Sequence, residues 1–82
     1  MYTNEKLQKI LELAECMDLA IYINFNSEQP TIDGFSTYNL SIPHLHNGIN
    51  YVVTNNKLRY KHPEEKWLEY NINNITKIEF LF

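Results

Sequence analysis

The sequence of 82 residues contains only one cysteine, two glycines and three prolines. With Cys16 alone, a disulfide framework and the four-cysteine spacing of a zinc site are both excluded. This cysteine usage is typical of a reducing compartment, so we expect the chain to be cytoplasmic. We interpret Cys16 as a small hydrophobic residue buried at the end of a helix.

Long apolar runs are also missing. No stretch reaches the roughly 18 apolar residues of a membrane span, and the polar, helix-like N-terminus is not typical of a signal peptide. The length predicts one domain over residues 1–82. An apolar fraction of 44%, which includes four Phe, one Trp and six Tyr, suffices for one small core.

Charge of either sign is scarce. The formal net charge of −3 argues against a dominant, non-specific mode of phosphate binding. Four cations nevertheless fall close together, at Lys57, Arg59, Lys61 and Lys66. Eleven asparagines, together with many Ile, Lys and Tyr, correspond to AT-rich codons, which indicates a low-GC bacterium or one of its phages or mobile elements.

Motifs of catalysis are absent. The sequence has no Gly-rich phosphate loop, no G-x-S-x-G and no H-E-x-x-H. His44 and His46 form an H-x-H pair, but turn residues place them in a loop over residues 43–48 without a nearby acid, so we expect solvent-facing side chains. Glu64 and Glu65 follow a proline in a turn, where carboxylates are usually solvated. We therefore expect no enzyme activity, no metal site and no cofactor.

The clearest structural pattern is a hairpin centred on Asn55-Asn56. Asparagine tolerates the positive φ that a type I′ turn needs at both central positions. A turn there separates an apolar face from a polar one, and a slip by one residue would mix the two. The predicted pairs are Thr54 with Lys57, Val53 with Leu58, Val52 with Arg59, and Tyr51 with Tyr60.

A third strand over residues 66–72 extends this hairpin into a meander. Residues 62–65 carry proline at the position that a type I turn favours. The apolar face stays continuous when Leu58 pairs with Tyr70 and Tyr60 with Leu68. The same register makes two pairs on the polar face, an ion pair of Arg59 with Glu69 and a cation–π pair of Lys61 with Trp67.

The remaining segments predict one helix and three more strands. A helix over residues 4–16, capped by Thr3 or Asn4, shows apolar residues at helical spacing. Strands are predicted over residues 18–26, ending at a break over 27–30, and over 35–42, where Tyr38, Leu40 and Ile42 share a face. Residues 71–74 form a turn or one helical turn. Ile78, Phe80 and Phe82 share one face of a last strand. The residues expected to be largely buried are Leu11, Ile23, Leu58, Leu68, Ile78 and Phe80.

These elements predict an α+β fold, with the N-terminal helix packed on a curled antiparallel sheet or small open barrel of about five to six strands. Its polar meander face carries tryptophan and arginine, which often dominate interface energetics. We expect a non-catalytic protein-binding module, such as a phage or mobile-element inhibitor or adaptor of a larger host or defence enzyme. The alternative is a small-barrel module that binds RNA or single-stranded DNA, and a homodimer is also compatible with the sequence. The predicted partner-binding residues are Val52, Lys57, Arg59, Lys61, Trp67 and Glu69.

Overall fold

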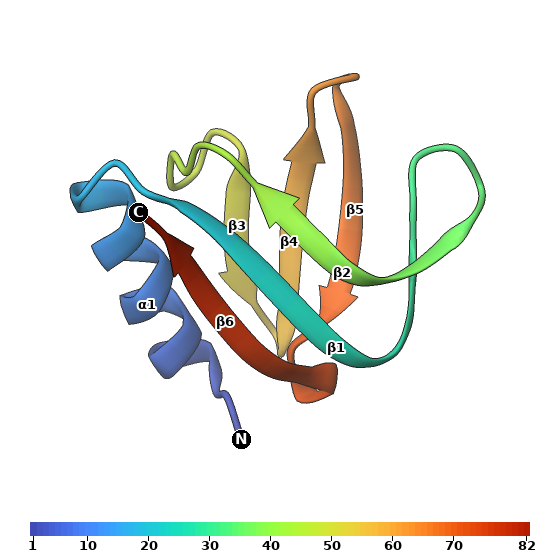
Figure 1. Ribbon diagram of the computed structural model, residues 1–82, viewed down its shortest axis with the longest axis horizontal. Coiled ribbons are helices and arrows are strands. Elements are labelled where there is room, and N and C mark those ends of the chain that lie inside the picture. Colours follow the sequence, from blue (N-terminus) through green and yellow to red (C-terminus); the bar gives the residue numbers. More distant parts are fainter.

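The chain forms one α-helix, one short 3-10 helix and six strands, arranged as two antiparallel sheets (Figure 1). The computed structural model describes all residues, 1–82. The elements are α1 (Asn4–Cys16), β1 (Ala20–Pro30), β2 (Ser36–Ile42), β3 (Tyr51–Thr54), β4 (Lys57–His62), β5 (Lys66–Asn71), η1 (Ile72–Asn74) and β6 (Ile75–Leu81). The strand order is β2-β1-β6 in one sheet and β3-β4-β5 in the other, and both sheets stay open. The predicted α+β class is confirmed.

The meander β3-β4-β5 has the predicted register. Asn55 and Asn56 have φ angles of 51° and 60°, the left-handed values that a type I′ turn requires. All four predicted pairs of the first hairpin occur, and Leu58 pairs with Tyr70 on the third strand. The apolar alternation thus points Tyr51, Leu58, Tyr60 and Tyr70 into the core.

The second turn of the meander also follows its sequence. The carbonyl of His62 accepts a hydrogen bond from the Glu65 N–H at 2.9 Å, which closes a turn with Pro63 at its second position. Glu65 then takes a left-handed φ of 65° before β5 begins. A type I turn followed by one left-handed residue is the usual three-residue hairpin loop.

α1 begins and ends where predicted. Thr3 caps it, because its Oγ1 accepts a hydrogen bond from the Lys6 N–H at 3.2 Å. Its buried stripe is Leu7, Leu11 and Ala14. The prediction for Cys16 is wrong, since this side chain is exposed. Two residues beyond Ala14, it lies about 200° further round the helix and so faces away from the core. At 13 residues, α1 lacks the length and the apolar character needed to cross a bilayer.

β1 is longer than predicted. Residues 27–30 do not end it, because β1 continues to Pro30 and pairs there with Ser36 of β2. The register with β2 shifts between Asn24 and Gln29, so extra β1 residues bulge out of the ladder. Gln29 is buried beyond this irregularity, and its side-chain amide donates to the Ser27 carbonyl at 3.3 Å. Beyond Phe25 this polar stretch has β2 as its one neighbouring strand, an edge position at which proline is tolerated.

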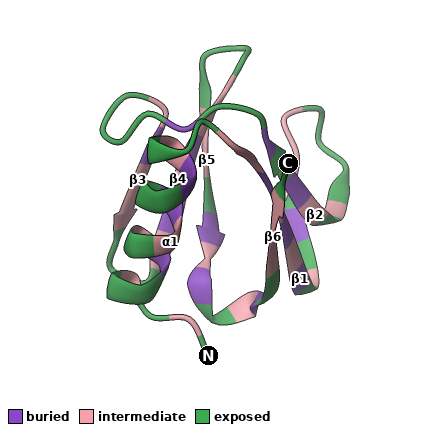
Figure 2. Ribbon diagram, turned by 60° about the vertical axis from the view of Figure 1, so that its left-hand side comes forward, coloured by how far each residue is buried: buried purple, intermediate pink, exposed green.

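The core lies between the two sheets, with α1 over β3 at one side (Figures 1 and 2). The rings of Phe25 on β1 and Tyr70 on β5 stack across it, with centroids 5.7 Å apart. Three of the six predicted core residues, Leu11, Ile23 and Leu58, have no exposed area. The other three, Leu68, Ile78 and Phe80, are only half-buried against the core. All three lie on β5 or β6, which are edge strands and therefore have a neighbour on one side only.

Two further face assignments need correction. Tyr38 is 52% exposed, although Leu40 and Ile42 on the same strand are buried as expected. It lies opposite the irregular part of β1, where the pairing shifts register. Phe82 is 96% exposed and lies beyond the end of β6, so it does not extend the inner face.

Candidate functional site

The outer face of the meander brings the predicted binding residues together. The three strands align their outward residues in rows, because side chains directly opposite each other share a face. The middle row is Val52, Arg59 and Glu69, in that order across β3, β4 and β5. Lys57 lies on one side of Arg59 along β4, and Lys61, which pairs with Trp67, lies on the other side. We call Val52, Lys57, Arg59, Lys61, Trp67 and Glu69 the outer meander face.

No other element covers this face. In Figure 1 the sheet β2-β1-β6 and α1 lie on the same side of the meander, which is the side of the core. The inward residues of β4, Leu58 and Tyr60, are buried. The outward Arg59 and Glu69 keep 43% and 59% of their side-chain areas exposed. The strand alternation therefore leaves one side of this sheet to solvent.

Trp67 and Arg59 form the centre of the outer meander face. The Cζ atom of Arg59 lies over the Trp67 ring, 5.3 Å from its centroid, in a cation–π arrangement. The predicted cation was Lys61, the direct cross-strand neighbour. Lys61 instead forms an ion pair with Glu65 in the adjoining turn. Arg59 reaches the indole from the diagonal position, a distance that long side chains can span.

The predicted ion pair of Arg59 and Glu69 is present but loose. The Arg59 Nε atom lies 3.4 Å from Glu69 Oε2, yet this nitrogen makes no hydrogen bond. Exposed pairs of this kind contribute little to stability. This Nε atom is itself buried, so the donors that an incoming carboxylate can reach are the terminal nitrogens of the guanidinium, beside a half-buried indole.

The three histidines do not belong to a cluster of three metal-ligating side chains. Nowhere in the chain do three or more His, Cys, Asp or Glu side chains come close enough to hold an ion. His44 and His46 are exposed in the loop, as expected. Asn50 holds this loop, since its Oδ1 accepts from the His46 N–H at 2.8 Å and its Nδ2 donates to the His44 carbonyl at 2.7 Å. His62 is half-buried, with Nε2 2.8 Å from the Tyr70 hydroxyl oxygen.

The end of α1 carries a polar cluster that the sequence did not predict. Oε1 of Glu15 accepts from the Tyr51 hydroxyl at 3.3 Å and from the Asn47 N–H at 3.1 Å. Burial, and then the neighbouring carboxylate, hold the pKa of Tyr51 well above its usual value. Glu15 follows Ala14 of the buried stripe, and helical spacing alone assigns it no contact. Its role depends on contacts more than thirty residues away, which no local pattern reveals.

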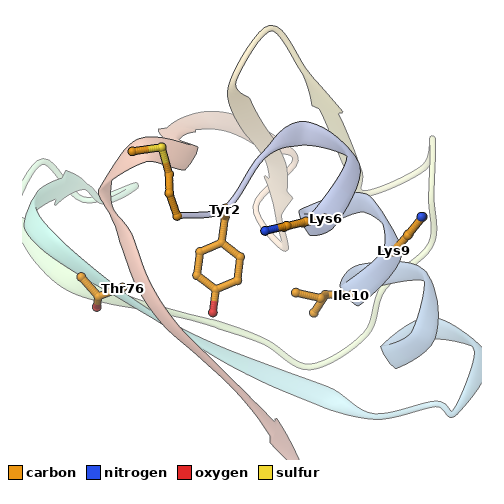
Figure 3. A pocket seen from close by; sticks show the side chains of 6 residues that line it. Tyr2, Lys6, Lys9, Ile10 and Thr76 are labelled. Atoms are coloured by element: carbon orange, nitrogen blue, oxygen red, sulfur yellow. The ribbon is translucent and has the colours of Figure 1, made fainter.

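A surface hollow of about 480 Å³ lies between α1 and β6 (Figure 3). Tyr2 and Ile10 contribute apolar surface, while Lys6, Lys9 and Thr76 contribute polar groups. Tyr2 is half-buried and packs against the core, so the hollow has a fixed wall. No sequence pattern predicted it, because its residues come from opposite ends of the chain.

Comparison with models of protein families, with curated proteins and with solved structures found no match to this chain.

Proposed function

We propose that this chain is a non-catalytic protein-binding module that docks on a larger partner through the outer meander face. The observation that supports this is the arrangement of Arg59 over a partly exposed Trp67 at the centre of an uncovered sheet. Trp and Arg are the side chains that most often dominate binding energy at interfaces. A partner that covers them removes apolar indole surface from water while it satisfies the guanidinium donors.

The charges of this face favour an acidic partner surface. Lys57, Arg59 and Lys61 project from one strand, against the single carboxylate of Glu69 within the face. The chain as a whole carries a formal net charge of −3, so this local excess of cations is set apart from its surroundings. Complementary charge speeds association and selects the partner more than it raises affinity.

The kind of partner follows from size and composition. A small single domain without a metal cluster suits an inhibitor or adaptor, which acts by occupying a surface. The AT-rich composition suits a low-GC bacterium or a phage or mobile element within it. We therefore propose that the chain acts in the cytoplasm of such a bacterium and binds a host or defence enzyme.

The experiment begins with capture of partners from a low-GC bacterial lysate and their identification by mass spectrometry. The affinity of the captured protein for the wild type is then compared with that for Trp67→Ala. We expect at least tenfold weaker binding and a melting temperature close to that of the wild type, because roughly 100 Å² of apolar burial is worth about 2.5 kcal/mol. Phe35→Ala is the control, since it removes an aromatic ring that is 75% exposed in a loop outside the face. Equal affinities of wild type and Trp67→Ala would place the binding surface elsewhere.

The row of cations also supports a second candidate, which is binding of RNA or single-stranded DNA. Such binding would use Arg59, Lys61 and Lys66, with bases stacked on Trp67. Salt separates the two candidates, because protein binding releases counterions from nucleic acid and this release becomes less favourable as the salt concentration increases, so the affinity decreases steeply. Binding to an oligonucleotide that decreases by orders of magnitude between 50 and 200 mM salt would favour the nucleic-acid candidate.

A further inference from the structure

β6 is an open edge of its sheet. It hydrogen-bonds to β1 alone, so its other side presents unpaired backbone N–H and C=O groups. Seven residues long, it carries Ile75, Ile78, Phe80 and Leu81, and Phe82 beyond it is almost fully exposed. A long apolar edge of this kind is a template for another strand.

The charged residues of β6 would face opposite charges if the strand paired antiparallel with the β6 strand of a second copy. Lys77 and Glu79 lie on the outer face, one residue to either side of Ile78. If a second β6 pairs antiparallel with a two-fold axis at Ile78, each Lys77 faces the other strand's Glu79. Shifting the axis to Lys77 or to Glu79 would place two identical charges directly opposite each other, which is destabilising. The axis at Ile78 is thus the register that the charges select.

The same register places Ile78 opposite Ile78 on the inner face. Phe80 of one copy lies opposite Thr76 of the other, an exposed residue where the pairing of β6 with β1 shifts register. Thr76 lines the hollow between α1 and β6, where Tyr2 and Ile10 offer apolar surface beside the strand (Figure 3). The hollow therefore gives the second copy room along the edge of β6 and an apolar wall to contact.

We propose that a second copy of this chain is the occupant of this edge. Two β6 strands pair antiparallel about Ile78 and join the two sheets into one sheet of six strands. The interface is isologous, because each copy offers the same strand to the other. Within one copy, Lys77 Nζ lies 2.7 Å from Glu79 Oε1, and dimerisation exchanges two such pairs, one in each copy, for two pairs between copies. The outer meander face lies on the other sheet and stays free for a partner.

Charge reversal tests the register directly. Lys77→Glu alone makes both positions acidic, and Glu79→Lys alone makes both positions basic, so each variant should repel its own copy. Sedimentation equilibrium should show a dimer for the wild type at micromolar concentrations and at least tenfold weaker self-association for each variant. The Lys77 and Glu79 side chains are 66% and 40% exposed, and the melting temperatures check that each variant remains folded.

Mixing the two variants provides the decisive measurement. An acidic strand and a basic strand are complementary in the same register, so an equimolar mixture of Lys77→Glu and Glu79→Lys should form a heterodimer. The double variant Lys77→Glu/Glu79→Lys should regain the homodimer. If the pair of Lys77 and Glu79 acts only inside one copy, the double variant should regain self-association and the mixture of the two single variants should not. A wild type that remains monomeric at 100 micromolar, or a dimer that neither single variant weakens, would overturn the proposal.

Trp67→Ala separates this proposal from the proposed function. It changes the outer meander face and leaves β6 intact, so its self-association should equal that of the wild type. Weakened self-association of a folded Trp67→Ala protein would instead place the dimer interface on the meander.

Discussion

Nε2 of His62 lies 2.8 Å from the hydroxyl oxygen of Tyr70, on the inner side of the meander. Burial lowers the pKa of His62 below its usual 6.5, although the carboxylate of Glu64 acts weakly in the opposite direction. Burial also raises the pKa of Tyr70 to about 12, so the hydroxyl keeps its proton at neutral pH. The fold therefore favours a neutral imidazole beside a phenol that can donate to it.

This pair predicts a loss of stability in mild acid. As the pH decreases through 6.5, the unfolded chain binds a proton at His62 before the folded chain does. Stability is full above this pH, decreases below it, and levels off once the pH falls below the folded pKa. Urea unfolding between pH 7.5 and pH 5 should show this decrease, and His62→Gln should flatten it. His46→Gln, in the exposed loop, is the control; a His62→Gln profile as steep as that of the wild type would assign the proton to another group.

The Asn55-Asn56 turn predicts opposite effects of two small residues at one position. Asn56 has a φ of 60°, which a β-carbon makes costly and which glycine adopts freely. Its side chain makes no hydrogen bond, whereas its backbone N–H donates to Asn4 Oδ1 at 3.0 Å in any variant. Asn56→Ala should therefore lose about 1 kcal/mol of unfolding free energy, and Asn56→Gly should match or exceed the wild type. Equal losses in chemical denaturation would mean that the side chain matters more than the turn.

Leu58 predicts the largest effect of a single truncation in the meander. It has no exposed area and lies between β3 and β5 on the inner face. Leu58→Ala should cost about 2–4 kcal/mol, because apolar contacts are lost and a cavity remains. Leu13→Ala on the exposed side of α1 is the matched control and should change stability by less than about 0.5 kcal/mol. Calorimetry that finds similar melting temperatures for the two variants would contradict this assignment of the core.

The meander could be predicted residue by residue because its determinants are local. The asparagine turn, the Pro63 turn and the period of two each specify the same register, and they agree. The bounds of α1 followed from Thr3 and from helical spacing for the same reason. These signals lie within a few residues of the structure that they determine.

The rest depended on contacts between distant segments. The strand break expected over residues 27–30 does not occur, because β2 pairs with this polar stretch beyond a bulge. Arg59 forms the cation–π contact with Trp67 that was predicted for Lys61, because Lys61 forms an ion pair with Glu65 in the adjoining turn. Ile78 is only half-buried because β6 lies at the edge of its sheet. The alternation of residues within one strand does not show where that strand lies in the sheet. Local pattern predicted the face of the meander residues, whereas it failed at Tyr38 and Phe82, and tertiary neighbours decided how deeply each residue is buried.

The pairing of β1 with β6 sets the order in which the chain can fold. Phe25 pairs with Ile75, fifty residues later, and Ala20 pairs with Leu81. β1 joins its sheet between β2 and this last strand, so half of its ladder requires a large loop to close first. The meander and the pairing of β1 with β2 involve only short loop closures and should form early, whereas the first sheet is complete only when β6 joins it. During synthesis on the ribosome, one edge of β1 therefore lacks its partner strand until β6 has emerged.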